Sequence, residues 1–162
     1  MQIIIKNKDT LLYDDFKFKC AIGKSGITKN KKEGDNKTPK GVYFLGPLYY
    51  RKDRLSKPQT KIKSIQISKK FSWCDDINSK FYNKPIRVKK KIRCERLFRK
   101  DKIYDLLIPI KYNTIRPKRN KGSAIFLHLT HNYKKTQGCI AIKKKDMLIL
   151  LKLIDKKTKI KI

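Results

Sequence analysis

Apolar and polar residues alternate in short runs along most of this chain, with the two-residue period of a β-strand. Two such runs, at residues 3–5 and 11–13, flank a turn-forming cluster and predict an opening hairpin. A third run at 16–20 predicts a half-buried strand. Further strands are expected at residues 42–45, 103–110 and 158–162, whereas the polar, glycine-containing stretch 23–41 predicts a loop.

One stretch departs from this period. Residues 144–153 are almost continuously apolar after two lysines, and Asp146 lies near the start, which predicts a helix buried on a wide face. At 162 residues the chain fits a single domain, 1–162, with no linker or repeat. We therefore expect a mainly β fold of mixed, sandwich-like sheets with one substantial helix near the C-terminus.

The candidate chemistry lies in two apolar runs joined by the polar loop 130–138. In the run 123–129, strand alternation places His128 on the face opposite Leu127. In the run 139–142, Cys139 lies on the face opposite Ile140. Neighbouring strands would therefore bring His128 and Cys139 together.

A histidine beside a cysteine is typical of nucleophilic catalysis. An imidazole can take the proton of a thiol whose ordinary pKa is ~8.5, leaving a thiolate. Gly138 permits a close approach of the backbone, whose N–H groups could face an oxyanion. A buried structural cysteine is the alternative interpretation, and His131 in the loop is a rival to His128 as the base.

Residues 136–140, TQGCI, resemble the Ser/Thr-x-Gly-Cys-aliphatic signature of the L,D-transpeptidase catalytic domain, the YkuD-like family, with His128 as its upstream histidine. Other segments resemble the family in the expected order along the chain. Residues 23–27, 32–35 and 38–41 resemble its characteristic run ending in TPxG. Residues 50–54, 73–76, 82–83 and 122–128 resemble its short, single-domain bacterial branch.

The resemblance implies a cysteine acyltransferase acting on peptidoglycan tetrapeptide stems, with no cofactor and no metal. Cys139 would be the nucleophile, His128 the base and Gly138 part of the oxyanion turn. The thioester formed on release of D-alanine would pass to a second stem, giving a 3→3 crosslink, or to water, as in an L,D-carboxypeptidase. Gln137 and Ala141 depart from the residues common in the family, and the short 128–139 separation predicts a trimmed substrate loop.

Five further residues are candidates for substrate binding. Arg51 or Arg54 would bind a stem carboxylate through the guanidinium fork, unless they lie in a solvated loop. Trp73 and Asp75 would contact a sugar face or an amine, unless they only anchor their loop. Thr136, within the signature, is the fifth.

The formal charge of +31, from 44 Lys and Arg against 13 Asp and Glu, suggests two explanations. A basic surface favours polyanions, which makes a nucleic-acid-binding module the competing function. No RNA-binding motif or zinc-knuckle spacing supports it, so no specific nucleic acid is expected. The lysines are spread along the chain, which favours compositional drift into tolerant surface positions.

The four cysteines include no CxxC pair, so a metal site is not expected. Cys20 is predicted to lie in the core, and Cys74 and Cys94 are either structural or joined in one bridge. No stretch approaches ~18 apolar residues, so no transmembrane segment is expected. Residues 1–6 do not resemble a signal peptide, whereas the family implies the periplasmic side of the cell envelope; we prefer the envelope and keep the cytoplasm open. The oligomeric state is left open as well.

Overall fold

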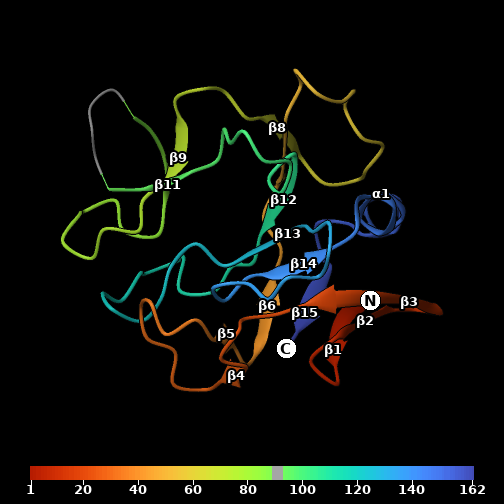
Figure 1. Ribbon diagram of the computed structural model, residues 1–162, viewed down its shortest axis with the longest axis horizontal. Coiled ribbons are helices and arrows are strands. Elements are labelled where there is room, and N and C mark those ends of the chain that lie inside the picture. Colours follow the sequence, from red (N-terminus) through yellow and green to blue (C-terminus); the bar gives the residue numbers. More distant parts are fainter. Residues whose placement is uncertain (89–92) are drawn as a thin grey trace.

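The computed structural model describes residues 1–88 and 93–162 (Figure 1). Its main feature is a mixed sheet of ten strands. The first five, in spatial order, are β6 (Val42–Phe44), β15 (Lys159–Lys161), β1 (Gln2–Lys6), β2 (Thr10–Tyr13) and β3 (Phe16–Ala21). The order continues with β14 (Ile140–Ile142), β13 (Phe126–Leu129), β12 (Leu106–Pro109), β7 (Leu48–Tyr50) and β8 (Ser64–Gln66).

This sheet curls around one apolar core. Side chains from both halves meet there, together with three from the helix α1 (Lys144–Leu153), which lies beside β13 and β14 in Figure 1. Members include Ile3, Leu11, Phe18, Leu127, Ile140, Ile142, Met147, Leu150 and Leu151. The mainly β fold with mixed sheets and one late helix is confirmed. Its two halves are continuous through the antiparallel pairing of β3 with β14.

A second apolar cluster covers the opposite face of β12 and β13. It contains Tyr49, Trp73, Leu97, Tyr104, Leu107 and Phe126. A three-stranded sheet contributes to it, in the order β10 (Pro85–Arg87), β9 (Phe71–Trp73) and β11 (Glu95–Arg96). The two strands therefore separate two cores, one on each face.

Most predicted elements are confirmed. The opening hairpin forms as β1 and β2, the helix spans Lys144–Leu153, and the closing strand lies between β1 and β6. Two expectations need correction. The strand expected at 103–110 begins only at Leu106, because the preceding residues turn, with the Asp105 N–H bonded to the Lys102 carbonyl. The stretch expected as a loop contains a short parallel pair, β4 (Ile27–Thr28) and β5 (Thr38–Pro39).

Candidate active site

The site is built on β13 and β14, which pair in parallel with His128 opposite Ala141. Leu127 and Ile140 point into the main core, while Cys139 packs against the second cluster beside Phe126. The predicted assignment of faces is therefore confirmed. It follows from the two-residue period, because each strand must bury its branched aliphatic residues on the helix side.

The thiol of Cys139 lies against the backbone of the neighbouring strand. Its Sγ accepts a hydrogen bond from the Phe126 N–H and donates to the Ala124 carbonyl, both at 3.3 Å. Burial raises the pKa of this thiol to about 12, although the Phe126 N–H acts in the opposite direction. At neutral pH the resting thiol is therefore protonated, and it needs a base to react.

His128 is held in the tautomer that a base requires. Its Nδ1 lies 2.9 Å from the Leu129 carbonyl oxygen. A carbonyl can only accept, so Nδ1 carries the proton and Nε2 keeps its lone pair. Burial lowers the pKa of the ring to about 4, which keeps it neutral at physiological pH. The ring packs edge to face on Tyr104, with centroids 5.2 Å apart.

Cys139 and His128 open onto the same cavity, of about 480 Å³, which Tyr104, Glu95 and Arg99 also line. Within residues 1–88 and 93–162 no hydrogen bond joins the His128 ring to the thiol. A smaller cavity of about 110 Å³ also reaches Cys139, Glu95 and Tyr104. The sulfur thus lies where two cavities meet. His131 lines the larger cavity too, but from the exposed loop.

Gly138 and Thr136 shape the turn before the cysteine. Gly138 has φ +136°, and a Cβ there would lie 2.9 Å from the Lys37 carbonyl oxygen. Glycine is therefore needed because the 23–41 segment packs over it, which differs from the expected close approach of a ligand. The Thr136 hydroxyl donates to the Cys139 carbonyl at 2.6 Å and accepts from the Gly138 N–H at 3.1 Å. Thr136 also lines the larger cavity.

Sequence reasoning did not identify Glu95, Arg99 and Tyr104, which line the larger cavity. Arg99 pairs with Glu95 at 3.2 Å and with Asp101 at 2.7 Å, and its guanidinium lies over the Tyr104 ring at 5.3 Å. Burial raises the pKa of Glu95 against the effect of Arg99. Glu95 and Arg99 lie in a charge-rich stretch without apolar period, so no pattern marked them.

A second polar group joins segments that are distant in sequence. The Glu33 carboxylate accepts hydrogen bonds from the hydroxyls of Tyr82 and Ser123. Glu33 and Ser123 line the smaller cavity. Burial, followed by Glu33, raises the pKa of Tyr82. Three segments that carry the resemblance thus meet beside Cys139.

Arg51 and Arg54 do not line either cavity. Arg51 is buried: it forms two hydrogen bonds to Asp53, at 2.8 and 2.7 Å, and stacks at 3.5 Å on the Phe98 ring. Arg54 pairs with Asp105 at 2.8 Å. Their guanidinium groups are engaged within the protein, so this placement does not support the expected binding of a stem carboxylate.

Trp73 and Asp75 lie in different surroundings, the first in the second apolar cluster and the second at the smaller cavity. Trp73 is buried, donates from Nε1 to Asn83 at 2.9 Å and packs edge to face on Phe126, as an anchor would. Asp75 lines the smaller cavity, and burial raises its pKa. Its buried Oδ1 has no hydrogen-bond partner in the described part of the chain; Arg93 Nε lies 4.0 Å away.

The four cysteines are all free thiols, so Cys74 and Cys94 form no bridge. Cys20 is buried, as predicted. Among residues 1–88 and 93–162 no cluster of side chains could hold a metal ion. In the same part of the chain, no helix has both the length and the apolar character needed to cross a bilayer.

The curled mixed sheet with one late helix defines a mainly β domain, in which a cysteine and a histidine line a shared cavity. The chain matches the YkuD family, described as the L,D-transpeptidase catalytic domain, over residues 2–162 and belongs to that family.

Two solved structures are similar to this chain. One is the helical cell shape determining protein Pgp2 from Campylobacter jejuni, with a TM-score of 0.56 and 18% identity, covering 99% of this chain and 46% of that one. The other is Bd1075 from Bdellovibrio bacteriovorus, with a TM-score of 0.49, 19% identity and the same coverage of both chains. The chain thus spans less than half the length of either protein. No curated protein matches it in sequence.

Proposed function

We propose that this domain is a cysteine acyltransferase acting on peptidoglycan tetrapeptide stems, an L,D-transpeptidase. One observation carries the proposal: Cys139 and a neutral His128, whose Nε2 lone pair is available, line one cavity in a domain of the YkuD family. A protonated thiol and a neutral imidazole form a competent pair when proton transfer accompanies attack.

In the acylation step, the Cys139 sulfur attacks the carbonyl of the L-centre of the diamino acid while its proton passes to His128 Nε2. A C–S bond forms, and the negative charge moves to the oxygen. There the Cys139 N–H would stabilise it, since the Gly138 N–H already donates to the Thr136 hydroxyl. The C–N bond to D-alanine then breaks. The imidazolium returns its proton to the leaving amine, so a thioester remains and His128 is neutral again.

In the second step an acceptor replaces the sulfur. A deprotonated amine of a second stem attacks the thioester carbonyl, gives its proton to His128, and the thiolate leaves and is reprotonated. Glu33, Asp75 and Glu95, three of the 13 acidic residues, line the small cavity beside Cys139, together with Lys31, which is paired with Asp35. We infer that they attract an amine-bearing acceptor, which favours crosslinking. Water as acceptor would make the same site an L,D-carboxypeptidase.

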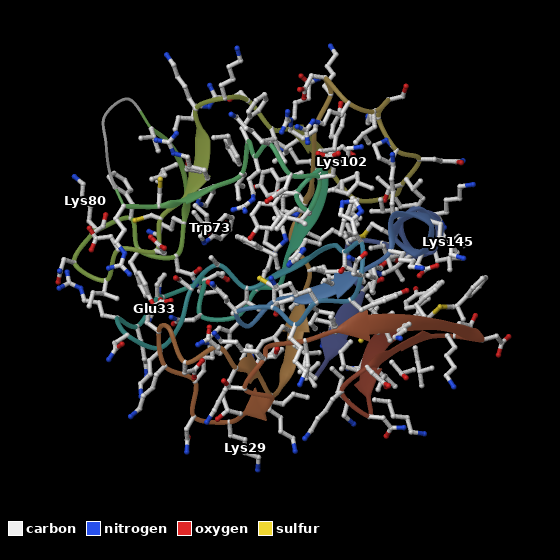
Figure 2. All side chains as sticks on the ribbon, in the orientation of Figure 1. Lys29, Glu33, Trp73, Lys80, Lys102 and Lys145 are labelled. Carbon is white, nitrogen blue, oxygen red and sulfur yellow. The ribbon has the colours of Figure 1, made fainter. Side chains whose placement is uncertain are left out.

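The basic surface is better explained by composition than by nucleic-acid binding. In Figure 2 the labelled lysines are far apart: Lys29 lies at the bottom, Lys80 at the left, Lys145 at the right and Lys102 within the upper part. A nucleic-acid site would concentrate them on one face. We therefore keep polyanion binding only as a secondary function.

The proposed place of action is the periplasmic side of the cell envelope, where crosslinked peptidoglycan lies. The fold is shared with a helical cell shape determining protein. We infer that this domain also acts on the wall in a way that affects cell shape.

A product analysis tests the proposal. Purified protein is incubated with disaccharide tetrapeptide, and free D-alanine, tripeptide and crosslinked dimer are quantified by chromatography and mass spectrometry. D-alanine with dimer indicates transpeptidation, and D-alanine with tripeptide alone indicates hydrolysis. Cys94→Ala, which removes another partly exposed thiol, is the matched control. No D-alanine release from the folded wild type would reject both activities.

A further inference from the structure

A second groove, of about 600 Å³, lies outside the catalytic site. The turn between β1 and β2, the end of β3, residues 23–26 and the loop 132–135 form its walls. Asn132 and Lys135 line both this groove and the cavity of Cys139, so one loop separates the two. The volume is within the range of about 300–1,000 Å³ that is usual for small-molecule sites.

The groove is strongly basic. Lys8, Lys19, Lys24 and Lys135 line it, and Asp9 is the one acid among its described residues, which leaves three positive charges uncompensated. None of the four lysines forms an ion pair in the part of the chain that the structure describes. Clustered ammonium groups in a concave surface raise the local concentration of anions.

Tyr133, which also lines the groove, has two ammonium groups near its ring: Lys19, one of the four groove lysines, and Lys143. Lys19 lies 4.9 Å and Lys143 5.4 Å from the centre of its ring. The Tyr133 N–H donates to the Thr130 hydroxyl at 2.9 Å, which fixes this loop residue. Cation–π attraction to this ring thus holds Lys19 beside the 132–135 wall of the groove.

The backbone of residues 24–26, which forms one wall of the groove, offers no free N–H group to an anion. The N–H groups of Lys24, Ser25 and Gly26 are bonded to the carbonyls of Thr136, Asn36 and Gly23. Recognition thus falls to the lysine side chains, which act as mobile point charges. Such a site accepts carboxylate and phosphate alike and lacks the geometric selectivity of an arginine fork.

We propose that this groove binds anionic groups, carboxylates or phosphodiesters, on the wall polymer whose stem peptide occupies the Cys139 cavity. The inference rests on the proposed function for the identity of the polymer. The groove itself is a separate binding site, and it holds the polymer beside the catalytic cavity without taking part in the chemistry.

The test compares two neutralised variants with equal loss of charge, both in a Cys139→Ala background so that the probe is not consumed. The groove variant is Lys8→Gln, Lys19→Gln and Lys24→Gln. The control is Lys57→Gln, Lys61→Gln and Lys69→Gln, three exposed lysines around β8, which lies at the top of Figure 1, away from β1–β3. Fluorescence anisotropy measures binding of soluble glycan strands bearing tetrapeptides and, separately, of a glycerol phosphate oligomer.

We expect the groove variant to bind one or both probes at least about tenfold more weakly than the Cys139→Ala parent, with a flatter dependence on salt, because fewer counterions are released. The control should stay within about twofold. Weakened binding of the glycan strands identifies carboxylates as the ligand, and weakened binding of the oligomer identifies phosphodiesters. Equal losses of affinity in the groove and control variants would contradict the proposed binding site. So would the absence of binding of either probe to the Cys139→Ala parent.

The proposed function is tested apart from the groove, with Cys139 restored, through release of D-alanine from the small disaccharide tetrapeptide. If D-alanine is released but the groove and control variants lose binding equally, the groove is rejected as a binding site and the proposed enzymatic activity stands. If only the groove variant loses binding and no D-alanine is released, the anion-binding site stands and its link to transpeptidation is rejected.

Discussion

The two faces of the β13–β14 pair have opposite characters, although their residues alternate in the same two short segments. One face carries Leu127, Leu129, Ile140 and Ile142, all almost fully buried in the main core. The other carries Cys139 and His128 beside a cavity. The difference shows that one strand can serve stability and chemistry at once, because successive side chains point to opposite faces.

The largest effect that this comparison predicts is at Cys139. Replacing it with alanine should lower D-alanine release by more than about 10⁴-fold, because no other group can form the thioester. The free energy of unfolding should change by no more than about 1 kcal/mol, since only one sulfur atom beside a cavity is lost. Activity and thermal unfolding are measured on the same preparation. Substantial turnover by the alanine variant would place the nucleophile elsewhere.

His128 should have the next largest effect. Replacement with glutamine keeps a polar side chain but removes the base, so kcat should fall by about 10²–10⁴-fold. His131→Gln, in the loop, is the matched control and should leave kcat within about twofold. A larger loss in the His131 variant would reverse the assignment of the base.

On the opposite face, which carries Ile140, substitutions should lower the stability of the fold. Ile140→Ala removes a fully buried side chain next to Cys139 in sequence and should lower the free energy of unfolding by about 2–5 kcal/mol. Ile149→Ala, at an exposed position of α1, should cost less than about 1 kcal/mol. Urea denaturation measures both. Equal costs would show that the β14 face is not a core face.

The smallest predicted effect is a dependence of stability on pH. The pKa of His128 is about 4 in the folded protein, against an ordinary value of about 6.5. Between these values the unfolded chain binds a proton that the native ring does not, so stability falls as the pH is lowered from 6.5 to 4. This residue accounts for up to about 3 kcal/mol of that loss. The slope of the free energy of unfolding against pH, measured by urea denaturation between pH 4 and 6.5, should be smaller in His128→Gln. An unchanged slope would contradict a buried, neutral His128 ring.

Predictions from the sequence were most accurate where the repeat of apolar positions determines which side chains face the core. Alternation was sufficient to place His128 and Cys139 on one side and Ile140 on the other, and the apolar run after Lys144 was sufficient for the helix. It could not place Glu95 or Arg99, because their position depends on β11 packing beside β9, a long-range contact with no local signal. The sequence suggested that Arg51 could bind substrate, yet its guanidinium forms a salt bridge with Asp53, two residues further along the chain.

Two residues of the site, Gly138 and Glu33, have roles that depend on contacts with distant segments of the chain. Gly138 is explained only when the Lys37 carbonyl is in place above it, about a hundred residues earlier in the chain. The Glu33 carboxylate likewise depends on Tyr82 and Ser123 for its partners. Tertiary contacts between distant segments thus complete a site whose centre the strand period alone predicts.

The most direct test of the account is to capture the acyl-enzyme. Wild type, Cys139→Ala and Cys94→Ala are each mixed briefly with disaccharide tetrapeptide and measured by intact-mass spectrometry, followed by peptide mapping. The account predicts a disaccharide-tripeptide adduct on wild type and Cys94→Ala, mapped to Cys139, with none on Cys139→Ala. An adduct on another residue, or its persistence in Cys139→Ala, would contradict the central claim.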